Sequence, residues 1–302
     1  MTKIKITHDL GLSSKDIKRL KSFGKLMMYN SRPNSTDEWL KRVEGANIIC
    51  SGVSGLKEGY SKLKNVFISL PMVGHAYLDK KILKKNNITV ANSPGCNKDA
   101  VSEWIIGMII NLFRKMMFFI NNENLPNNKA PHTTLGLVDK NILIIGKGNI
   151  GIRVGQICKI LKMKVSYFKR GDNLIEAIKN QKVIVNCLSA NETSKNLLNI
   201  DFFSNLENET FFISIAPRET YDKDAMFKAL DTGKIKEAAI DEGTMPTGKT
   251  DDIYYQKLIK HSKIIATPHI AYNSDYTDTL ANKMMIDNIE GWLNGKPINL
   301  VK

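Results

Sequence analysis

The sequence lacks long hydrophobic runs and is poor in cysteine, and each absence excludes a class of protein. No apolar run reaches the roughly 18 residues that a bilayer-spanning helix needs, and residues 1–12 lack the apolar stretch of a signal peptide. Four cysteines are scattered without metal-ligand spacing: Cys50, Cys96, Cys158 and Cys187. We therefore expect a cytoplasmic protein with no membrane partner, no disulfide framework and no bound metal. Cys96 falls in a loop, where a reactive thiol is an alternative to a small core residue.

Acidic residues are scarce beside basic ones. The chain has 30 Asp and Glu against 44 Lys and Arg, a formal net charge of +14. The basic residues are spread over the whole chain, no basic run is interleaved with aromatics, and no helix-turn-helix or zinc signature is present. We therefore expect no nucleic-acid partner, and the charge instead indicates a general positive field that attracts anionic substrates and phosphates.

The first ninety residues alternate short β-rich runs with Lys-rich amphipathic stretches, which is typical of an α/β domain. Strands are predicted at 4–7, 47–50, 66–69 and 88–90, and helices at 13–22 and 78–85. Residues 99–119 form a longer apolar run that predicts a buried helix, either linking two domains or packing between subunits. A loop is predicted at 121–139 because of its Asn, Pro and His content.

From residue 141 the pattern becomes strictly β-α-β. Six short apolar strand cores follow one another: NILIIG, VSYFK, KVIVNC, TFFISI, EAAID and KIIAT. Such runs belong to a parallel sheet buried on both faces, and a last helix at about 275–293 is expected to return to the first domain. The sequence therefore predicts an α/β protein with two domains. These are a Rossmann doubly wound parallel-sheet cofactor domain at 98–272 and a flavodoxin-like substrate domain of residues 1–97 plus 273–302.

A glycine-rich turn follows the first strand of the second domain. GKGNIG places Gly146, Gly148 and Gly151 between the strand NILII and a helix. In this context the glycines allow a tight turn, close approach of a pyrophosphate and close helix packing, and the helix N-terminus favours the anion. We therefore predict a dinucleotide site that includes Asn149 and Ile150 of the same turn.

The residues after the next strand distinguish NAD from NADP. An acid there holds the ribose 2′-hydroxyl of NAD, whereas basic residues pair with the 2′-phosphate of NADP. In this chain Lys169 and Arg170 occupy the position, and the first acid is Asp172. NADP is therefore favoured, with NAD as the alternative if the two cations are only surface charges.

Polar residues gather where the later strands end. Arg218 comes shortly after TFFISI, Asp241 and Glu242 come directly after EAAI, and His269 comes shortly after KIIAT. Ligands bind at the carboxyl ends of strands in such sheets, so these groups are expected at one edge. An arginine grips a carboxylate and polarises a keto oxygen, and a histidine exchanges the hydroxyl proton during hydride transfer. The set predicts chemistry on a 2-hydroxy acid, with a structural histidine and a surface ion pair as the alternative.

Three segments of the chain resemble the D-isomer-specific 2-hydroxyacid dehydrogenase family, which includes glyoxylate/hydroxypyruvate reductases and phosphoglycerate dehydrogenases. They are ANSPGCNKDAVSEWIIGMIINLFR, GKGNIG and TPHIA, and the resemblance covers nearly the whole chain. It implies that His269 is the catalytic histidine and that Asp241 contacts the nicotinamide amide. LPMVGHAYLD is similar to the family loop whose backbone amides bind the substrate carboxylate, here Val73 and Gly74. Two further cofactor contacts follow strands of the second domain: Leu188 and Ala216.

The chain departs from the family pattern at two positions. The family arginine falls on Pro217, so Arg218 is shifted by one residue and the loop must be rearranged to aim it. The family glutamate that pairs with the histidine falls on Pro246, and Glu242 or Glu219 is the nearest possible substitute. Because neighbouring strand residues point to opposite faces, Glu242 and Asp241 are not expected to face the cofactor together.

The sequence therefore predicts an NAD(P)-dependent oxidoreductase that interconverts a small 2-hydroxy acid and its 2-keto acid, such as glyoxylate or hydroxypyruvate. A different acid is an alternative, since formate dehydrogenases also resemble this family. A dinucleotide-sensing binding protein of the same fold is another, favoured by the two departures. The resemblance implies a homodimer, for which the apolar stretch 104–120 is a suitable interface, with an internal helix of a monomer as the alternative.

Overall fold

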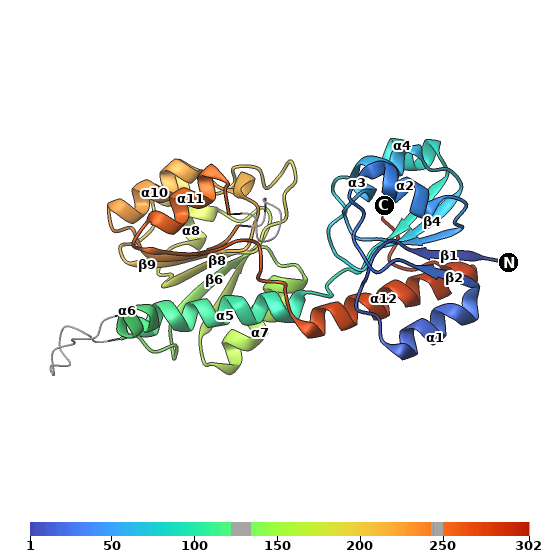
Figure 1. Ribbon diagram of the computed structural model, residues 1–302. Helices are drawn as coiled ribbons and strands as arrows, with labels where there is room; N and C mark the ends of the chain where they lie inside the picture. Colours follow the sequence, from blue (N-terminus) through green and yellow to red (C-terminus); the bar gives the residue numbers. More distant parts are fainter. Residues whose placement is uncertain (122–133, 243, 245–249, 302) are drawn as a thin grey trace. The chain divides into compact units, whose positions relative to one another are not determined.

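The computed structural model describes residues 1–121, 134–242, 244 and 250–301, and the chain divides into two compact units. Unit 1 comprises Met1–Asn97 and Asn273–Lys302, and unit 2 comprises Lys98–Tyr272. Each contains one parallel β-sheet covered by helices (Figure 1). The predicted α/β architecture with two parallel sheets is confirmed. No helix among the described residues is both long and apolar enough to cross a membrane.

Unit 1 has five strands in the order β2-β1-β3-β4-β5, which is the flavodoxin-like order. The strands are β1 (Lys3–Ile6), β2 (Lys25–Met28), β3 (Ile48–Cys50), β4 (Val66–Ser69) and β5 (Ile88–Ala91). The helical segments are α1 (Ser14–Phe23), α2 (Thr36–Val43), α3 (Leu56–Gly59), η1 (Tyr60–Lys62), α4 (Lys80–Lys85) and α12 (Asp275–Leu293). The sequence reading missed β2, because this edge strand has no fully buried residue and hence no strong apolar pattern.

The sheet of unit 1 is packed on both faces. The helices α1 and α12 cover one face, where Leu20 and Ile286 pack against Ile4 and Phe67 (Figure 1). On the other face Trp39 of α2 packs with residues of β3 and β4. Segments from both ends of the chain therefore build one core.

Unit 2 has six strands in the order β11-β10-β9-β8-β6-β7. The strands are β6 (Asn141–Ile145), β7 (Lys164–Phe168), β8 (Val183–Asn186), β9 (Thr210–Ser214), β10 (Ile235–Asp241) and β11 (Ile264–Thr267). The chain passes from β7 across β6 to β8, so the topological switch point lies between β6 and β8. Ligands bind in doubly wound sheets at the carboxyl ends of the strands beside this point.

Helices cover both faces of this sheet (Figure 1). On one face lie α5 (Lys98–Arg114) and α7 (Asn149–Ile160), whose apolar residues share a core with the strands. The other face is covered by α8 (Leu174–Ala177), α9 (Ile200–Ser204), α10 (Lys223–Asp231) and α11 (Ile253–Lys260). A 3₁₀ turn, η3 (Arg218–Thr220), lies between β9 and α10.

The single helix predicted at 99–119 is in fact two. The first, α5, ends at Arg114, and α6 (Met116–Asn121) follows Lys115, whose φ of 51° is left-handed and interrupts the helix. A long apolar run specifies burial but not the position of such a break. Most of the loop predicted at 121–139 lies outside the described residues.

Candidate functional site

The glycine turn between β6 and α7 has the geometry of a pyrophosphate site. Gly146 has φ +106°, and a Cβ there would lie 2.6 Å from the carbonyl oxygen of Cys187. A Cβ on Gly151 would lie 2.0 Å from the carbonyl oxygen of Gly146, so neither position has room for a side chain. A Cβ on Gly148, in contrast, would have no heavy atom within 4 Å, and Gly148 caps α7 without a side-chain hydrogen bond. Open space therefore adjoins Gly148 at the N-terminus of α7, where the first amides of a helix have no partner within it and suit a dinucleotide phosphate.

Two exposed cations follow β7. The guanidinium Nη2 of Arg170 donates to Thr193 Oγ1 at 2.9 Å, which ties Arg170 to the loop after β8. The backbone N–H of Lys169 donates to Asp172 Oδ2 at 2.9 Å, so the nearest acid closes the local turn. The sequence reading missed Thr193, because a contact across 23 residues leaves no periodic signal.

The two other expected cofactor contacts lie at the same edge of the sheet. Leu188 follows β8, and its N–H donates to Asn186 Oδ1 at 3.3 Å. Ala216 follows β9, is 2% exposed, and donates its N–H to Ser214 Oγ at 3.3 Å. Their backbones are therefore anchored to the ends of the strands that precede them.

Asp241 contacts the loop that carries His269. Its buried carboxylate accepts hydrogen bonds from Thr267 Oγ1 at 2.6 Å and from the N–H groups of Ile270 and Ala271, both at 2.9 Å. His269 is half-buried with a left-handed φ of +56°, and its ring packs edge-on against Tyr272 at 5.5 Å between centroids. The structure thus brings together Asp241 and the histidine loop, which the sequence treated as separate contacts.

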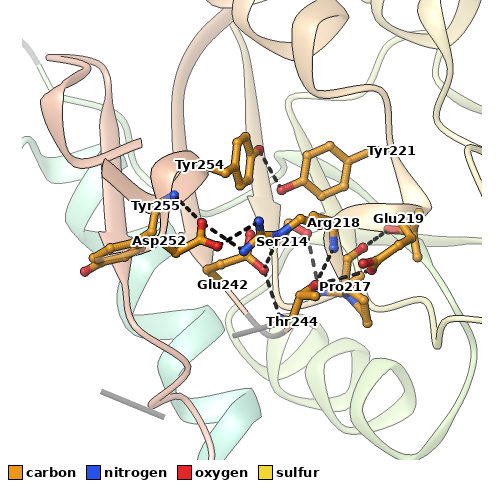
Figure 2. A network of polar contacts seen from close by, with 12 residues as sticks. Ser214, Pro217, Arg218, Glu219, Tyr221, Glu242, Thr244, Asp252, Tyr254 and Tyr255 are labelled. Carbon is orange, nitrogen blue, oxygen red and sulfur yellow. Dashed lines mark hydrogen bonds and ion pairs between the residues drawn. The ribbon is translucent and has the colours of Figure 1, made fainter. Parts of the chain in front are cut away.

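Arg218 lies between two carboxylates (Figure 2). Its Nε is 3.2 Å from Glu242 Oε1, and its Nη2 is 3.1 Å from Asp252 Oδ1. Its Nη1 donates to Asp252 Oδ2 at 3.2 Å, so Asp252 fills the guanidinium fork, as a carboxylate ligand would. The guanidinium also lies over the ring of Tyr254 at 5.0 Å. The sequence nominated Glu242 but missed Asp252 and Tyr254, which come from α11 and its N-cap.

Electrostatics and backbone contacts keep this cluster in place. A hydrogen bond from the Tyr255 N–H, together with the guanidinium, holds the pKa of Asp252 below its usual value. Burial alone would lower the pKa of Arg218, but its bonds to Asp252 and Glu242 raise it. The Arg218 N–H donates to Thr244 Oγ1 at 3.1 Å, and Pro217 has a φ of −55°, so the shifted loop places Arg218 in a 3₁₀ turn.

The two acids considered as partners of the histidine are engaged in this cluster. Glu242 is 1% exposed and accepts from the Thr244 N–H at 2.9 Å in addition to contacting Arg218. Glu219 accepts from Thr244 Oγ1 at 3.3 Å. Pro246, where the family glutamate is expected, lies outside the described residues.

In unit 1, Val73 and Gly74 lie in the loop after β4. The Val73 carbonyl accepts from Asn92 Nδ2 at 2.8 Å and lies 3.1 Å from His75 Nδ1. Because a trans peptide points its carbonyl and N–H in opposite directions, the Gly74 N–H points away from Asn92. A Cβ on Gly74 would meet no heavy atom within 4 Å, so this amide lies in an open part of the loop.

Cysteine and metal chemistry find little support in the described part of the chain. Cys96 is 2% exposed, and burial raises the pKa of its thiol to about 11, so it is a small core residue and not a reactive thiol. No group of His, Cys, Asp and Glu side chains among the described residues is arranged to hold a metal ion. Among the described residues of unit 2, the groups placed for chemistry are the glycine turn, His269 and the arginine–carboxylate cluster.

Comparison with known proteins agrees with this chemistry. Residues 106–271 match the model of the D-isomer specific 2-hydroxyacid dehydrogenase family, NAD binding domain. The chain belongs to this family. It is therefore a hydride-transfer oxidoreductase that uses a nicotinamide dinucleotide, and the predicted family and enzyme class are confirmed.

Individual relatives are distant. A putative 2-hydroxyacid dehydrogenase of Haemophilus influenzae is 25% identical over 85% of this chain and 87% of its own. A D-lactate dehydrogenase of Lactiplantibacillus plantarum is 28% identical over 72% of this chain and 71% of its own. Among solved structures, an acyclic imino acid reductase in complex with NADPH and D-Arg has a TM-score of 0.84 at 23% identity, with both chains fully covered. At that identity the last likeness shows the fold alone.

Proposed function

We propose that this 2-hydroxyacid dehydrogenase reduces a short 2-keto acid, such as glyoxylate or hydroxypyruvate, with NADPH. The observation that carries the proposal is the carboxyl edge of the unit 2 sheet, where an open glycine turn and the His269 loop held by Asp241 both lie. The reduced dinucleotide, when bound, supplies the hydride that adds to C2 of the keto acid. His269 gives a proton to the resulting alkoxide oxygen, which leaves a neutral hydroxyl.

The remaining proposed residues bind rather than react. The amides of Gly148, Asn149 and Ile150 hold the pyrophosphate at the N-terminus of α7. The open amides around Val73 and Gly74 bind the substrate carboxylate. Further dinucleotide contacts are proposed for Leu188, Ala216 and Asp241. Arg218 polarises the keto oxygen with a remaining N–H, because a guanidinium has five N–H groups and its contacts with Glu242 and Asp252 engage three.

Preference for NADPH is supported by the residues after β7. Arg170 is exposed and fixed by Thr193, Lys169 is also exposed, and Asp172 is already bonded to the Lys169 N–H. Two cations without a competing acid suit a 2′-phosphate. We expect Arg170→Ala to raise the KM for NADPH roughly tenfold or more and to leave that for NADH within about twofold. An equal effect on both cofactors would assign NAD instead.

The proposed function is tested by oxidation of NADPH at 340 nm with glyoxylate, hydroxypyruvate, pyruvate, phenylpyruvate and 2-ketogluconate, repeated with NADH. Turnover of a short keto acid, faster with NADPH, supports the proposal. Turnover of 2-ketogluconate or pyruvate alone would assign another acid. Tight dinucleotide binding without any turnover would mean that the protein is a dinucleotide sensor of the same fold.

Reduction of a 2-imino acid is a second candidate, favoured by the two carboxylates at Arg218. Glu242 and Asp252 give the cluster one more negative than positive charge, which suits a cationic iminium group. An iminium nitrogen carries its proton already and becomes a neutral amine on hydride addition, so it needs no proton donor. The keto-acid assay repeated with ammonium salts or alkylamines separates the two. A rate that depends on the amine assigns imino-acid reduction.

We also propose a homodimer. Side chains of α6 are unusually exposed for apolar residues: Met116 is 45%, Met117 46%, Phe118 44% and Ile120 69% exposed. A second copy of the chain that covers these residues would remove apolar area from water. Light scattering coupled to size-exclusion chromatography should give twice the mass of 34.0 kDa. A mass of one chain would refute the proposal.

A further inference from the structure

The carboxylate of Asp241 binds the histidine loop on both sides of His269. Asp241 ends β10 and lies opposite Thr267, the last residue of β11, in the parallel register. Thr267 Oγ1 donates to its Oδ1 from before the histidine. The N–H groups of Ile270 and Ala271 donate to Oδ1 and Oδ2 from after it. Because Asp241 is only 3% exposed, water does not compete effectively for these hydrogen bonds.

These hydrogen bonds stabilise a backbone conformation at His269 that is unfavourable on its own. His269 has a φ of +56°, a left-handed conformation that few residues with a Cβ adopt. The turn itself contributes one bond, from the His269 N–H to the Thr267 carbonyl at 3.1 Å. The Glu242 N–H adds a bond to the same carbonyl at 3.0 Å, and the three bonds to Asp241 tie both sides of the histidine to the end of β10.

We propose that Asp241 is a positioning residue that sets the place of the His269 imidazole through the loop. This inference rests on the proposed function of His269 as proton donor, and it goes beyond the nicotinamide contact that the family resemblance implies for Asp241. Because a catalytic group must lie within a fraction of an ångström of its productive position, loosening the loop affects the chemical step more than dinucleotide binding.

A carboxylate is the side chain that this position requires. Two oxygens accept three hydrogen bonds here, and both must be acceptors. An asparagine of the same shape has one acceptor oxygen and would set its NH₂ group against an N–H or a hydroxyl of the loop. Thr267 supplies one of the three donors, and serine in its place keeps the hydroxyl while valine removes it.

The test compares Asp241→Asn, Thr267→Val and Thr267→Ser with the wild type. Asp222→Asn is a matched control, because Asp222 caps α10 by accepting from the Ala225 N–H at 2.9 Å, far from the histidine loop in sequence. For Asp241→Asn we expect kcat to fall roughly 100-fold and the Kd for the dinucleotide to rise less than about tenfold, because an asparagine oxygen can still accept a hydrogen bond from the nicotinamide amide. Thr267→Val should show a smaller loss of kcat, and Thr267→Ser and Asp222→Asn should match the wild type.

Hydrogen–deuterium exchange of the peptide spanning 267–272 gives a readout that does not depend on activity. The Ile270 and Ala271 amides should exchange faster in Asp241→Asn than in the wild type, with the rest of β10 unchanged. A raised Kd for the dinucleotide with unchanged exchange would overturn the proposal and leave a nicotinamide contact. Full kcat with faster exchange would also overturn it. If the wild type reduces no acid, the proposed function fails, and the exchange measurement still decides whether Asp241 holds the loop.

Discussion

Arg218 differs from an arginine that only binds a substrate carboxylate, because two carboxylates of the chain itself contact its guanidinium. Its side chain is 16% exposed and contacts the side chain of Glu242, which is 1% exposed, so the pair is largely removed from water. Removing the cation leaves the buried carboxylate uncompensated, and this lowers the free energy of unfolding by more than the intact pair contributes to it. The cluster therefore has a structural role that is separable from any role in catalysis.

Arg218→Ala is expected to destabilise the protein by roughly 3 kcal/mol or more, because it leaves Glu242 buried without its cation. Adding Glu242→Gln to that variant removes the buried charge and should restore part of the loss. Urea unfolding of the two single variants and the double variant measures this coupling. Equal stability of Arg218→Ala and wild type would show that the ion pair contributes nothing.

His8 gives a prediction of pH dependence. Burial, and then the charges of Arg32 and Arg42, lower the pKa of His8 below its usual value, with Asp9 opposing them. The unfolded chain therefore takes up a proton near pH 6.5 that the folded chain refuses, and the free energy of unfolding falls as pH drops below about 6.5. His8→Gln should weaken this fall between pH 7.5 and pH 5.5, measured by urea unfolding. The same fall in variant and wild type would contradict the assignment.

In the turn between β6 and α7, one glycine is expected to affect dinucleotide binding alone, and another to affect both folding stability and binding. Gly148 has open space where a Cβ would lie, whereas a Cβ on Gly151 would lie 2.0 Å from the Gly146 carbonyl oxygen. Gly148→Ala should keep the wild-type Tm and weaken dinucleotide binding, because its methyl group lies where the pyrophosphate approaches. Gly151→Ala should lower the Tm and also weaken binding. Calorimetry and dinucleotide fluorescence titration check the pair, and a lowered Tm for Gly148→Ala would contradict this reading.

Elements with a strong local signal could be predicted from the sequence. The six strand cores of unit 2 are short apolar runs between polar segments, and the glycine turn has a recognisable spacing, so the sequence pattern locates both. β2 has a weak pattern, and the break at Lys115 depends on a single backbone angle. Within the site, strand ends nominated Arg218 and His269. Thr193, Asp252 and the three bonds of Asp241 required the tertiary structure, because their partners lie 23 to 34 residues away.

At the scale of the whole molecule, the net charge of +14 should affect encounter with anionic substrates. A positive field raises the rate at which keto acids and phosphates reach the protein, and salt screens that field. We expect kcat/KM for a keto acid to fall severalfold between about 0.02 M and 0.2 M ionic strength, with kcat nearly constant. A kcat/KM that does not change with salt would show that the charge has no influence on encounter.

The proposed reaction is hydride transfer from a nicotinamide ring to C2 of a keto acid, with His269 as proton donor. It is tested by reduction of the best keto acid other than glyoxylate, whose product has no stereocentre, with NADPH that carries deuterium at both nicotinamide C4 positions, followed by mass spectrometry and chiral analysis of the product. We expect a D-2-hydroxy acid with one deuterium at C2, and a rate lower by roughly 100-fold or more for His269→Gln. A product without deuterium at C2, or a His269→Gln variant as fast as the wild type, would contradict it.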